Sequence, residues 1–351
     1  MVVKRLTEIN RIVYYLSLFL IYMNLSSCLS QGKVFNHWDR FHELIETGEC
    51  LPVTIQLDPT NQCNRNCETC SGNRFDNGAQ LSFSAMRDII DQTKSFCRGI
   101  IFTGGGEPLC NEHTVDAIHY AKQQGIDVAL VTNGDLLDET SAKALVADCS
   151  YIRTSIVDDR SWKNAKVLVE AKKLMKDSCT IGTGFLTNKD TNSQLSRVVE
   201  KASECKVDYL QFRPYHLDIA DERDHIRQLQ EWYNHNAFRV IMSEHKYEDM
   251  WEKGEKRAGY PECLSDWIRT VIAADGRVYA DCHTRGLKEF CFGDLDRDDF
   301  MKIWKSRRRK SVQKNKLKEE RCPAMSCHDP LDKFLWETRQ QCDNGVHKNF
   351  L

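Results

Sequence analysis

Short apolar runs alternate with amphipathic segments through the first two thirds of the chain. The apolar runs are typical of strands buried in a sheet, and the segments between them repeat apolar residues at helical spacing. We expect strands at Val53–Leu57, Gly99–Phe102, Val128–Thr132, Tyr151–Val157, Thr180–Leu186 and Tyr209–Arg213. We expect helices at Phe83–Phe96, His113–Gln124, Ala142–Ala147, Asn164–Met175 and Leu195–Glu204.

Local signals agree with this alternation. Ser82 is placed to cap the N-terminus of the first of these helices, and Gly125 to end the second. Strands that alternate with helices indicate βα units and a parallel sheet. Six parallel strands predict an α/β fold, a partial (β/α)6 barrel that stays open rather than closing with eight strands.

The remaining segments suggest further parts of the molecule. A short helix is expected at Trp38–Glu46, one long helix at Arg223–Met242, and a hairpin around Asp275-Gly276 followed by two short helices. We therefore expect an N-terminal extension over residues 1–49 and a barrel core over 50–216. A helical linker over 217–262 and a small cysteine-rich domain over 263–351 complete the expected organisation.

The charge balance bears on the partners. The 351 residues contain 49 Lys and Arg against 51 Asp and Glu, a net charge of −2. Binding to a polyanion through bulk charge is therefore disfavoured, and we expect no nucleic-acid partner. The basic run Lys302–Lys318 is interpreted as a solvated helix face, with contact to an anionic substrate or nucleic acid as the alternative.

An apolar run at Ile12–Met23 follows Lys4, Arg5 and Arg11 and precedes Cys28. This order resembles a lipoprotein signal, although the run is shorter than the roughly 20 residues that span a bilayer. A membrane-surface helix and a true start at Met23 are alternatives. Because the chemistry below needs reduced thiolates, we expect a cytoplasmic protein, with membrane association through residues 12–23 left open.

Sixteen cysteines are many for a chain large enough to bury its own core. Clustered thiols in such a chain indicate metal or iron–sulfur ligands. Cys63, Cys67 and Cys70 follow the first predicted strand, at the end where parallel folds place their chemistry. Structural zinc prefers four protein ligands, whereas this loop supplies three and leaves one coordination position open.

A glycine segment follows the second predicted strand. Its sequence is Thr103-Gly104-Gly105-Gly106-Glu107-Pro108. Glycines let a backbone approach a ligand closely, and a carboxylate beside them can pair with an ammonium group. Together with the three-cysteine loop, this segment resembles the radical SAM superfamily. The resemblance implies that the three cysteines hold a [4Fe–4S] cluster, that S-adenosylmethionine (SAM) chelates its fourth iron, and that the glycine segment binds the methionyl ammonium.

The same resemblance implies further contacts with SAM. Asn133 and Ser155 stand where the family places polar groups for the ribose and methionyl parts, and Gly182 and Gly184 could allow close approach of the adenosine. A turn-forming role for Asn133 and a plain strand hydroxyl for Ser155 are the alternatives. Thr69 departs from the family, which usually has an aromatic residue before the third cysteine.

The C-terminal cysteines resemble a SPASM/twitch auxiliary-cluster domain. The resemblance rests on the hairpin between Cys263 and Cys282 and on the sequence Phe292-Gly293-Asp294-Leu295. It implies a second [4Fe–4S] cluster, in the shorter one-cluster form, held by Cys263, Cys282, Cys322 and Cys327. Cys291 and Cys342 would then be spare thiols. A structural zinc on four cysteines is the alternative.

The implied activity is radical chemistry. We expect reductive cleavage of SAM and hydrogen abstraction from a small polar substrate (a sugar, aminocyclitol or nucleoside-like molecule), with net oxidation or rearrangement. An external electron donor of flavodoxin or ferredoxin type is implied. A radical SAM peptide maturase is the second candidate, and a non-catalytic iron–sulfur or zinc module is the candidate from another class.

Overall fold

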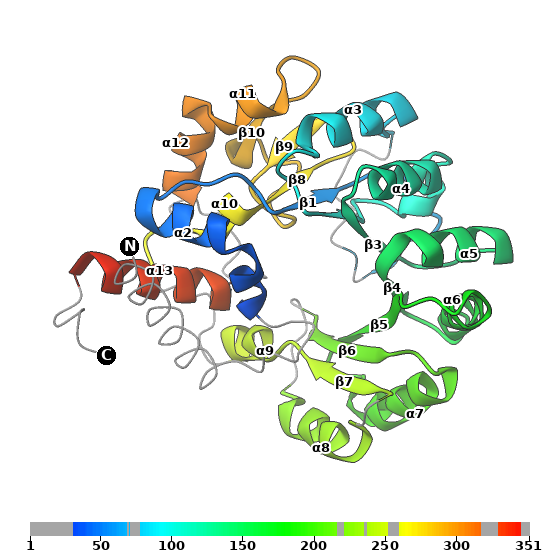
Figure 1. Ribbon diagram of the computed structural model, residues 1–351. Helices are drawn as coiled ribbons and strands as arrows, with labels where there is room; N and C mark the ends of the chain where they lie inside the picture. Colours follow the sequence, from blue (N-terminus) through cyan, green and yellow to red (C-terminus); the bar gives the residue numbers. More distant parts are fainter. Residues whose placement is uncertain are drawn as a thin grey trace, which may run out of the picture.

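The computed structural model describes residues 31–68, 70, 78–215, 221–234, 237–251, 260–316 and 329–344. One curved sheet forms the centre, in the order β10-β9-β8-β1-β2-β3-β4-β5-β6-β7 (Figure 1). The strands are β1 (Thr54–Leu57), β2 (Gly99–Phe102), β3 (Asp127–Thr132), β4 (Cys149–Ile156), β5 (Thr180–Thr187), β6 (Tyr209–Pro214), β7 (Arg239–Met242), β8 (Arg269–Ile272), β9 (Arg277–Tyr279) and β10 (Cys291–Asp294).

Helices follow most of these strands. In the barrel they are α3 (Phe83–Thr93), η3 (Pro108–Cys110), α4 (Thr114–Gln123), α5 (Glu139–Asp148), α6 (Ser161–Met175), η4 (Asn192–Gln194), α7 (Leu195–Cys205), α8 (Arg223–Tyr233) and α9 (Glu244–Trp251). Before and after the barrel they are η1 (Gln31–His37), α2 (Trp38–Thr47), α10 (Ser265–Ile268), η5 (Lys288–Phe290), α11 (Phe300–Trp304), α12 (Arg307–Asn315) and α13 (Asp329–Asn344).

The expected α/β partial barrel is confirmed. The six predicted strands are β1 to β6, and every adjacent pair among them is parallel. The Ser82 side chain accepts a hydrogen bond from the Ala85 N–H and caps α3, as its sequence position predicts. Gly125 follows α4 with a φ of 80°, a conformation that glycine adopts without strain.

The prediction of one long helix at Arg223–Met242 is wrong. Helix α8 ends at Tyr233, and Arg239–Met242 form β7, which pairs in parallel with β6. The side chain of Asn234 accepts a hydrogen bond from the Val240 N–H at 2.7 Å and so fixes the change of direction. The segment expected to be only a helical linker therefore adds a seventh parallel strand to the barrel.

The two faces of the curved sheet differ. Helices α3 to α8 cover its outer side (Figure 1), where alternate strand residues such as Ile55, Phe102 and Ile152 are buried. The intervening residues point to the concave side, and most of them are half-buried. On the parallel strands these residues include Gln56, Ile101, Val131, Arg153, Ser155, Leu186 and Arg213. Solvent therefore reaches the concave face, as a binding site there requires.

The C-terminal part continues the same sheet. Strand β8 pairs in parallel with β1, and the predicted hairpin at Asp275-Gly276 is confirmed as β8–β9. Arg285 donates a hydrogen bond to the fully buried carboxylate of Asp58, just after β1, at 2.7 Å. A strand pairing and a buried ion pair thus join the auxiliary part to the barrel.

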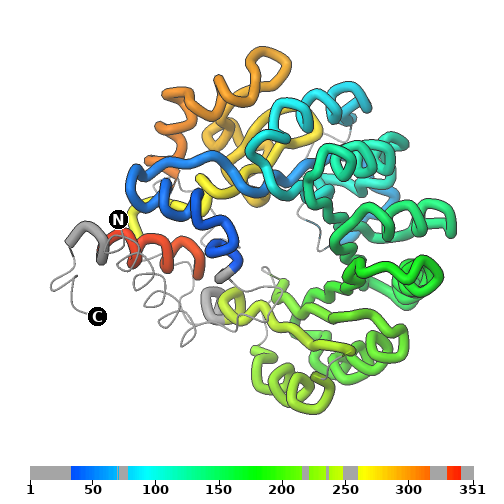
Figure 2. Tube along the Cα trace, viewed as in Figure 1, coloured from blue at the N-terminus to red at the C-terminus, as the bar shows by residue number. Residues whose placement is uncertain are grey.

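The first and last described α-helices also meet. Figure 2 shows α2 and α13 beside each other, and the rings of Phe41 and Phe334 stack at 6.1 Å between them. Residues 12–23 lie outside the described residues. Among the helices that are described, none is long and apolar enough to cross a membrane.

The basic run is not a uniformly solvated face, contrary to the expectation. Arg309 in α12 is fully buried, with its guanidinium 3.3 Å from the ring centroid of Trp267 and 4.0 Å from that of Trp304. Lys316, just after α12, is also buried. Arg309 stacks on aromatic rings, and Lys316 forms ion pairs with Asp266 and Asp281, so the run is partly internal structure.

Candidate active site

The three clustered cysteines follow β1 at the C-terminal end of the parallel strands. Cys63 and Cys70 are exposed, Cys67 is half-buried, and none of the three is in a disulfide. The Cys70 N–H donates to the Cys67 carbonyl at 3.0 Å, and the Arg65 N–H donates to the Cys63 Sγ at 3.4 Å. These bonds curl the loop. Thr69 lies outside the described residues.

The thiols lie near one another. Burial raises the pKa of the Cys63 and Cys67 thiols, and the neighbouring Cys70 raises both further. Within the described ranges, no three His, Cys, Asp or Glu side chains form a closed metal site. The donor set nevertheless fits an iron–sulfur cluster, because three accessible thiols on one short loop are the ligands such a cluster uses.

The glycine segment is built against this loop. The Gly106 N–H donates to the Thr60 carbonyl at 3.1 Å, and the Glu107 N–H donates to the Gln62 carbonyl at 2.8 Å. A Cβ atom at Gly106 would lie 2.0 Å from the Gln62 oxygen, so only glycine fits there. A Cβ at Gly104 would lie 3.3 Å from the Thr60 oxygen. The segment carrying Gly104, Gly105 and Gly106 is therefore held beside Cys63.

Glu107 is 3% exposed, and protein donors hold its carboxylate in place. Its Oε1 accepts from the Leu109 N–H at 3.2 Å and from the Thr132 hydroxyl at 2.5 Å, and its Oε2 accepts from the Asn133 N–H at 2.6 Å. Burial raises the pKa of Glu107. A carboxylate has about four acceptor positions. The three contacts from the described residues leave about one acceptor position, on Oε2. That position is enough to accept one N–H of an ammonium group.

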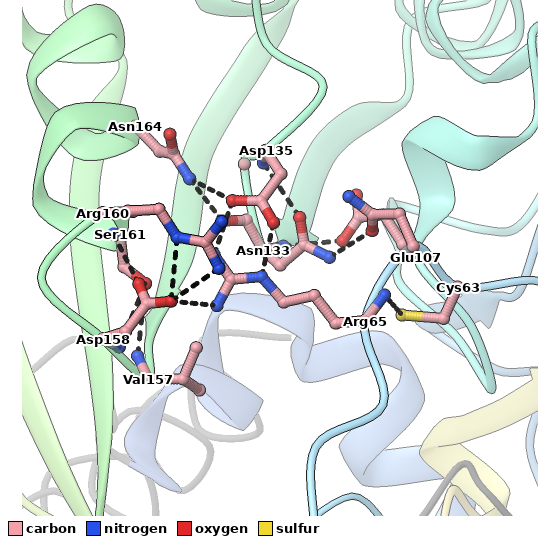
Figure 3. A network of polar contacts seen from close by, with 12 residues as sticks. Cys63, Arg65, Glu107, Asn133, Asp135, Val157, Asp158, Arg160, Ser161 and Asn164 are labelled. Atoms are coloured by element: carbon pink, nitrogen blue, oxygen red, sulfur yellow. Dashed lines mark hydrogen bonds and ion pairs between the residues drawn. The ribbon is translucent and has the colours of Figure 1, made fainter.

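Asn133 joins the end of β3 to the cysteine loop (Figure 3). Its Nδ2 donates to the Asn64 Oδ1 at 2.7 Å, and its Oδ1 accepts from the Asp135 N–H at 2.9 Å. The second contact is the turn-forming role that the sequence offered as the alternative. Ser155 is half-buried on the concave face of β4, opposite Gly184 of β5. Contacts of Asn133 and Ser155 with SAM stay predictions.

Arg65 is a residue that sequence reasoning missed. Its Nε and Nη2 donate to the two carboxylate oxygens of Asp135, each at 2.5 Å, and its Nη1 donates to Asp158 at 3.4 Å (Figure 3). The Arg65 hydrogen bonds lower the pKa of Asp135. Asn164 also donates to Asp135, at 2.7 Å. The cysteine loop is thus fastened to the loops after β3 and β4. The sequence did hold one signal for these contacts, because Asp135 and Asp158 follow successive predicted strands.

The auxiliary site is described in part. Cys263, before α10, is buried, and Cys282, after β9, is half-buried. Cys322 and Cys327 lie outside the described residues, so the four-cysteine cluster stays a prediction. Cys291, expected to be spare, is buried at the start of β10 and belongs to the same apolar cluster against which Cys282 packs.

Comparison with protein families gives two matches. A model described as the radical SAM superfamily matches residues 57–156, which hold the cysteine loop, the glycine segment and Asn133. A second model, SPASM, described as an iron–sulfur cluster-binding domain, matches residues 263–328. Its range includes all four of the predicted auxiliary ligands.

Curated relatives and solved structures agree with these matches. The chain is 26% identical over 183 residues to Fe-coproporphyrin III synthase of Methanosarcina barkeri, covering 48% of this chain and 45% of that protein. It is 32% identical over 88 residues to S-adenosylmethionine-dependent nucleotide dehydratase of Selenomonas ruminantium, covering 25% of this chain and 32% of that protein. The alignments span less than half of either relative.

The crystal structure of Streptococcus suis SuiB superposes with a TM-score of 0.64 at 13% identity, covering 93% of this chain and 82% of that one. At this identity the likeness shows the fold alone. It extends over the barrel and the C-terminal part together.

Proposed function

From the premise that this chain is a radical SAM protein with a C-terminal SPASM iron–sulfur domain, we propose that it oxidises or rearranges a small polar substrate. Its cofactors are a [4Fe–4S] cluster, SAM and additional iron–sulfur centres in the SPASM domain. The chemistry that the bound cluster and SAM supply is one-electron cleavage of the sulfonium to methionine and a 5′-deoxyadenosyl radical, which takes hydrogen from the substrate.

The contact between the glycine segment and the cysteine loop carries this proposal. Hydrogen bonds from Gly106 and Glu107 to the residues before Cys63 bring a buried carboxylate and an open three-thiol loop to one edge of the sheet. A plain iron–sulfur or zinc module needs the thiols but has no use for the carboxylate. This pairing therefore favours the enzyme over the non-catalytic module.

We assign a role to each candidate residue. Cys63, Cys67 and Cys70 would hold the first cluster, and Glu107 would accept a hydrogen bond from the methionyl ammonium. Asn133 and Ser155 would contact the rest of SAM. Four further cysteines, at 263, 282, 322 and 327, would hold a second [4Fe–4S] cluster that accepts an electron from the substrate radical.

The concave face supports a polar substrate. Gln56, Arg153 and Ser155 are half-buried there, so hydrogen-bonding groups face the space below the cysteine loop. The similarity to a nucleotide dehydratase agrees with a sugar-like or nucleoside-like molecule. An external flavodoxin-type or ferredoxin-type donor would supply the first electron, and the cytoplasm is the proposed compartment.

Anaerobic reconstitution tests the proposal. The protein should hold about eight irons per chain, because two four-iron clusters are implied. With a strong reductant it should convert SAM to methionine and 5′-deoxyadenosine. About four irons and one zinc would contradict the second cluster. Full iron loading without any 5′-deoxyadenosine would contradict the radical activity and favour the non-catalytic module.

Glu107→Ala should weaken SAM binding. The substitution removes the acceptor for the ammonium, and an unpaired buried cation costs about 2–4 kcal/mol, roughly a 30-fold to 1,000-fold rise in Kd. Iron content should stay unchanged, because Glu107 is not a cluster ligand. Glu112, whose side chain is 87% exposed, is a matched control for replacement by Ala. Equal SAM affinity in the Glu107 and Glu112 variants would exclude this role.

A further inference from the structure

We propose that the concave face of the barrel binds a phosphate group of the substrate between Arg153 of β4 and Arg213 of β6, beside Gly184 of β5. The inference rests on the proposed function and narrows it: the small polar substrate is a phosphorylated metabolite. Three observations carry the inference. They are how Arg153 is held, the position of Gly184 between the two arginines, and the position of both below the cysteine loop.

Arg153 is held by neutral, buried residues. Its Nη1 donates to the Gln211 Oε1 at 2.8 Å, and the Gln211 Nε2 donates to the Ser243 hydroxyl at 2.9 Å. Gln211 and Ser243 are both buried. Because Ser243 engages the amide nitrogen of Gln211, the amide oxygen is turned toward the arginine. The guanidinium is thus oriented before any ligand arrives, which lowers the entropic cost of binding.

Among the residues that the structure describes, no side chain balances the charge of Arg153. A guanidinium has five N–H donors, and the contact with Gln211 uses one of them. No carboxylate in the described part of the chain forms an ion pair with Arg153. Arg65, by contrast, pairs with both Asp135 and Asp158. A half-buried cation with only a neutral partner is stabilised when an anion binds beside it.

Gly184 lies where the two arginine side chains come together. A Cβ atom at Gly184 would lie 3.7 Å from the Cδ of Arg153 and 3.7 Å from the Nη2 of Arg213. Both arginines therefore border the place where a side chain would stand. Gly182 differs, since a Cβ there would lie 2.0 Å from the Tyr209 ring, which already fills its place. Of the two glycines expected to let the adenosine approach closely, only Gly184 has no ring filling its place.

Arg153 lies deeper in the barrel than the residues proposed to contact SAM. Arg153 precedes Ser155 by two residues on the same face, about 7 Å farther from the sheet edge that carries the cysteine loop. At that edge, beyond the end of β6, the Tyr215 hydroxyl donates to the Glu68 carbonyl of the cysteine loop at 3.5 Å. An anion held by Arg153 and Arg213 beside Gly184 would lie at the level of Ser155, and Arg153 would hold it from the side away from the cysteine loop. Its organic part could then point up toward the reacting centre.

Two guanidinium groups match a phosphate better than a carboxylate. A phosphate monoester carries close to two negative charges and three terminal oxygens, so two forked donors can each engage it. A carboxylate has one charge and two oxygens. We therefore assign the site to phosphate.

Calorimetric titration of inorganic phosphate into the anaerobic, SAM-loaded holoenzyme tests the assignment. Arg153→Gln should weaken phosphate binding at least tenfold and leave SAM affinity within twofold. Gly184→Val should have a similar effect, because its methyl groups would stand between the two arginines while its Cβ meets only ordinary contacts. Arg197→Gln is the matched control, since that side chain is 67% exposed on the outer helix α7 and should bind phosphate as the wild type does.

Several results would overturn the proposal. They are absence of phosphate binding by the wild type, equal losses in the Arg153 and Arg197 variants, loss of SAM affinity instead of phosphate affinity in Arg153→Gln, and equal affinity for acetate. Failure of this inference can be distinguished from failure of the proposed function. Formation of 5′-deoxyadenosine without phosphate binding contradicts this inference alone, and phosphate binding without 5′-deoxyadenosine contradicts the radical activity alone.

Discussion

Replacing Cys63, Cys67 and Cys70 together with alanine should abolish formation of 5′-deoxyadenosine and remove about four irons per chain. The three thiols belong to one loop after β1, so their loss leaves the first cluster without any protein ligand. The predicted auxiliary ligands come from other segments, beginning with the buried Cys263, and should keep about four irons. Iron analysis and chromatography of the reaction products measure the two effects.

Cys110→Ser is the matched control for the triple variant. Cys110 is a half-buried thiol at the end of η3, close to the cysteine loop but outside the motif. The control should keep both the full iron content and the cleavage of SAM. If the triple variant still formed 5′-deoxyadenosine above the background of free iron and reductant, the assignment of the three ligands would be wrong.

Lys316→Met should destabilise the fold by about 3–5 kcal/mol, the usual result of breaking a buried ion pair. The Lys316 ammonium lies between two carboxylates, 2.9 Å from Asp266 and 3.0 Å from Asp281, and all three side chains are at most 2% exposed. Methionine fills a similar volume but leaves two negative charges facing each other without water. A lower urea midpoint of the holoprotein measures the loss.

Lys314 offers a close control. It lies two residues earlier and is exposed, so Lys314→Met removes the same charge without breaking a buried pair. Its midpoint should stay near that of the wild type, since single surface charges contribute little. Equal midpoints for the two variants would mean that the buried lysine is not required for stability.

The strands of the barrel could be predicted because their signal is local. Each apolar run sits between helices with clear limits, such as the Ser82 cap of α3 and the stop at Gly125. The error at Arg223–Met242 has a physical cause. Val240 and Ile241 fit a helical pattern as well as a strand, and the pairing with β6 that makes them a strand is not written in the segment itself.

In the candidate site, too, only the local features could be predicted from the sequence. The cysteine loop and the glycine segment are short motifs, so their residues can be read from neighbouring positions. The contacts that hold them are not local: Arg65 meets Asp135 across 70 residues and Asp158 across 93. In the basic run, Arg309 and Lys316 look like their neighbours, because composition alone cannot distinguish a buried cation from a solvated one.

The pairing of β1 with β8 has a consequence for how the chain folds as it leaves the ribosome. Strand β1 is synthesised early, but its neighbour β8 is synthesised much later. The same holds for Arg285, the partner of Asp58, which lies 227 residues farther along the chain. Until then β1 is an uncovered edge with unpaired backbone groups, open to pairing with other chains. Such distant pairing also makes folding slow. We expect overproduction in cells to depend on chaperones, and a fragment ending before β8 to aggregate.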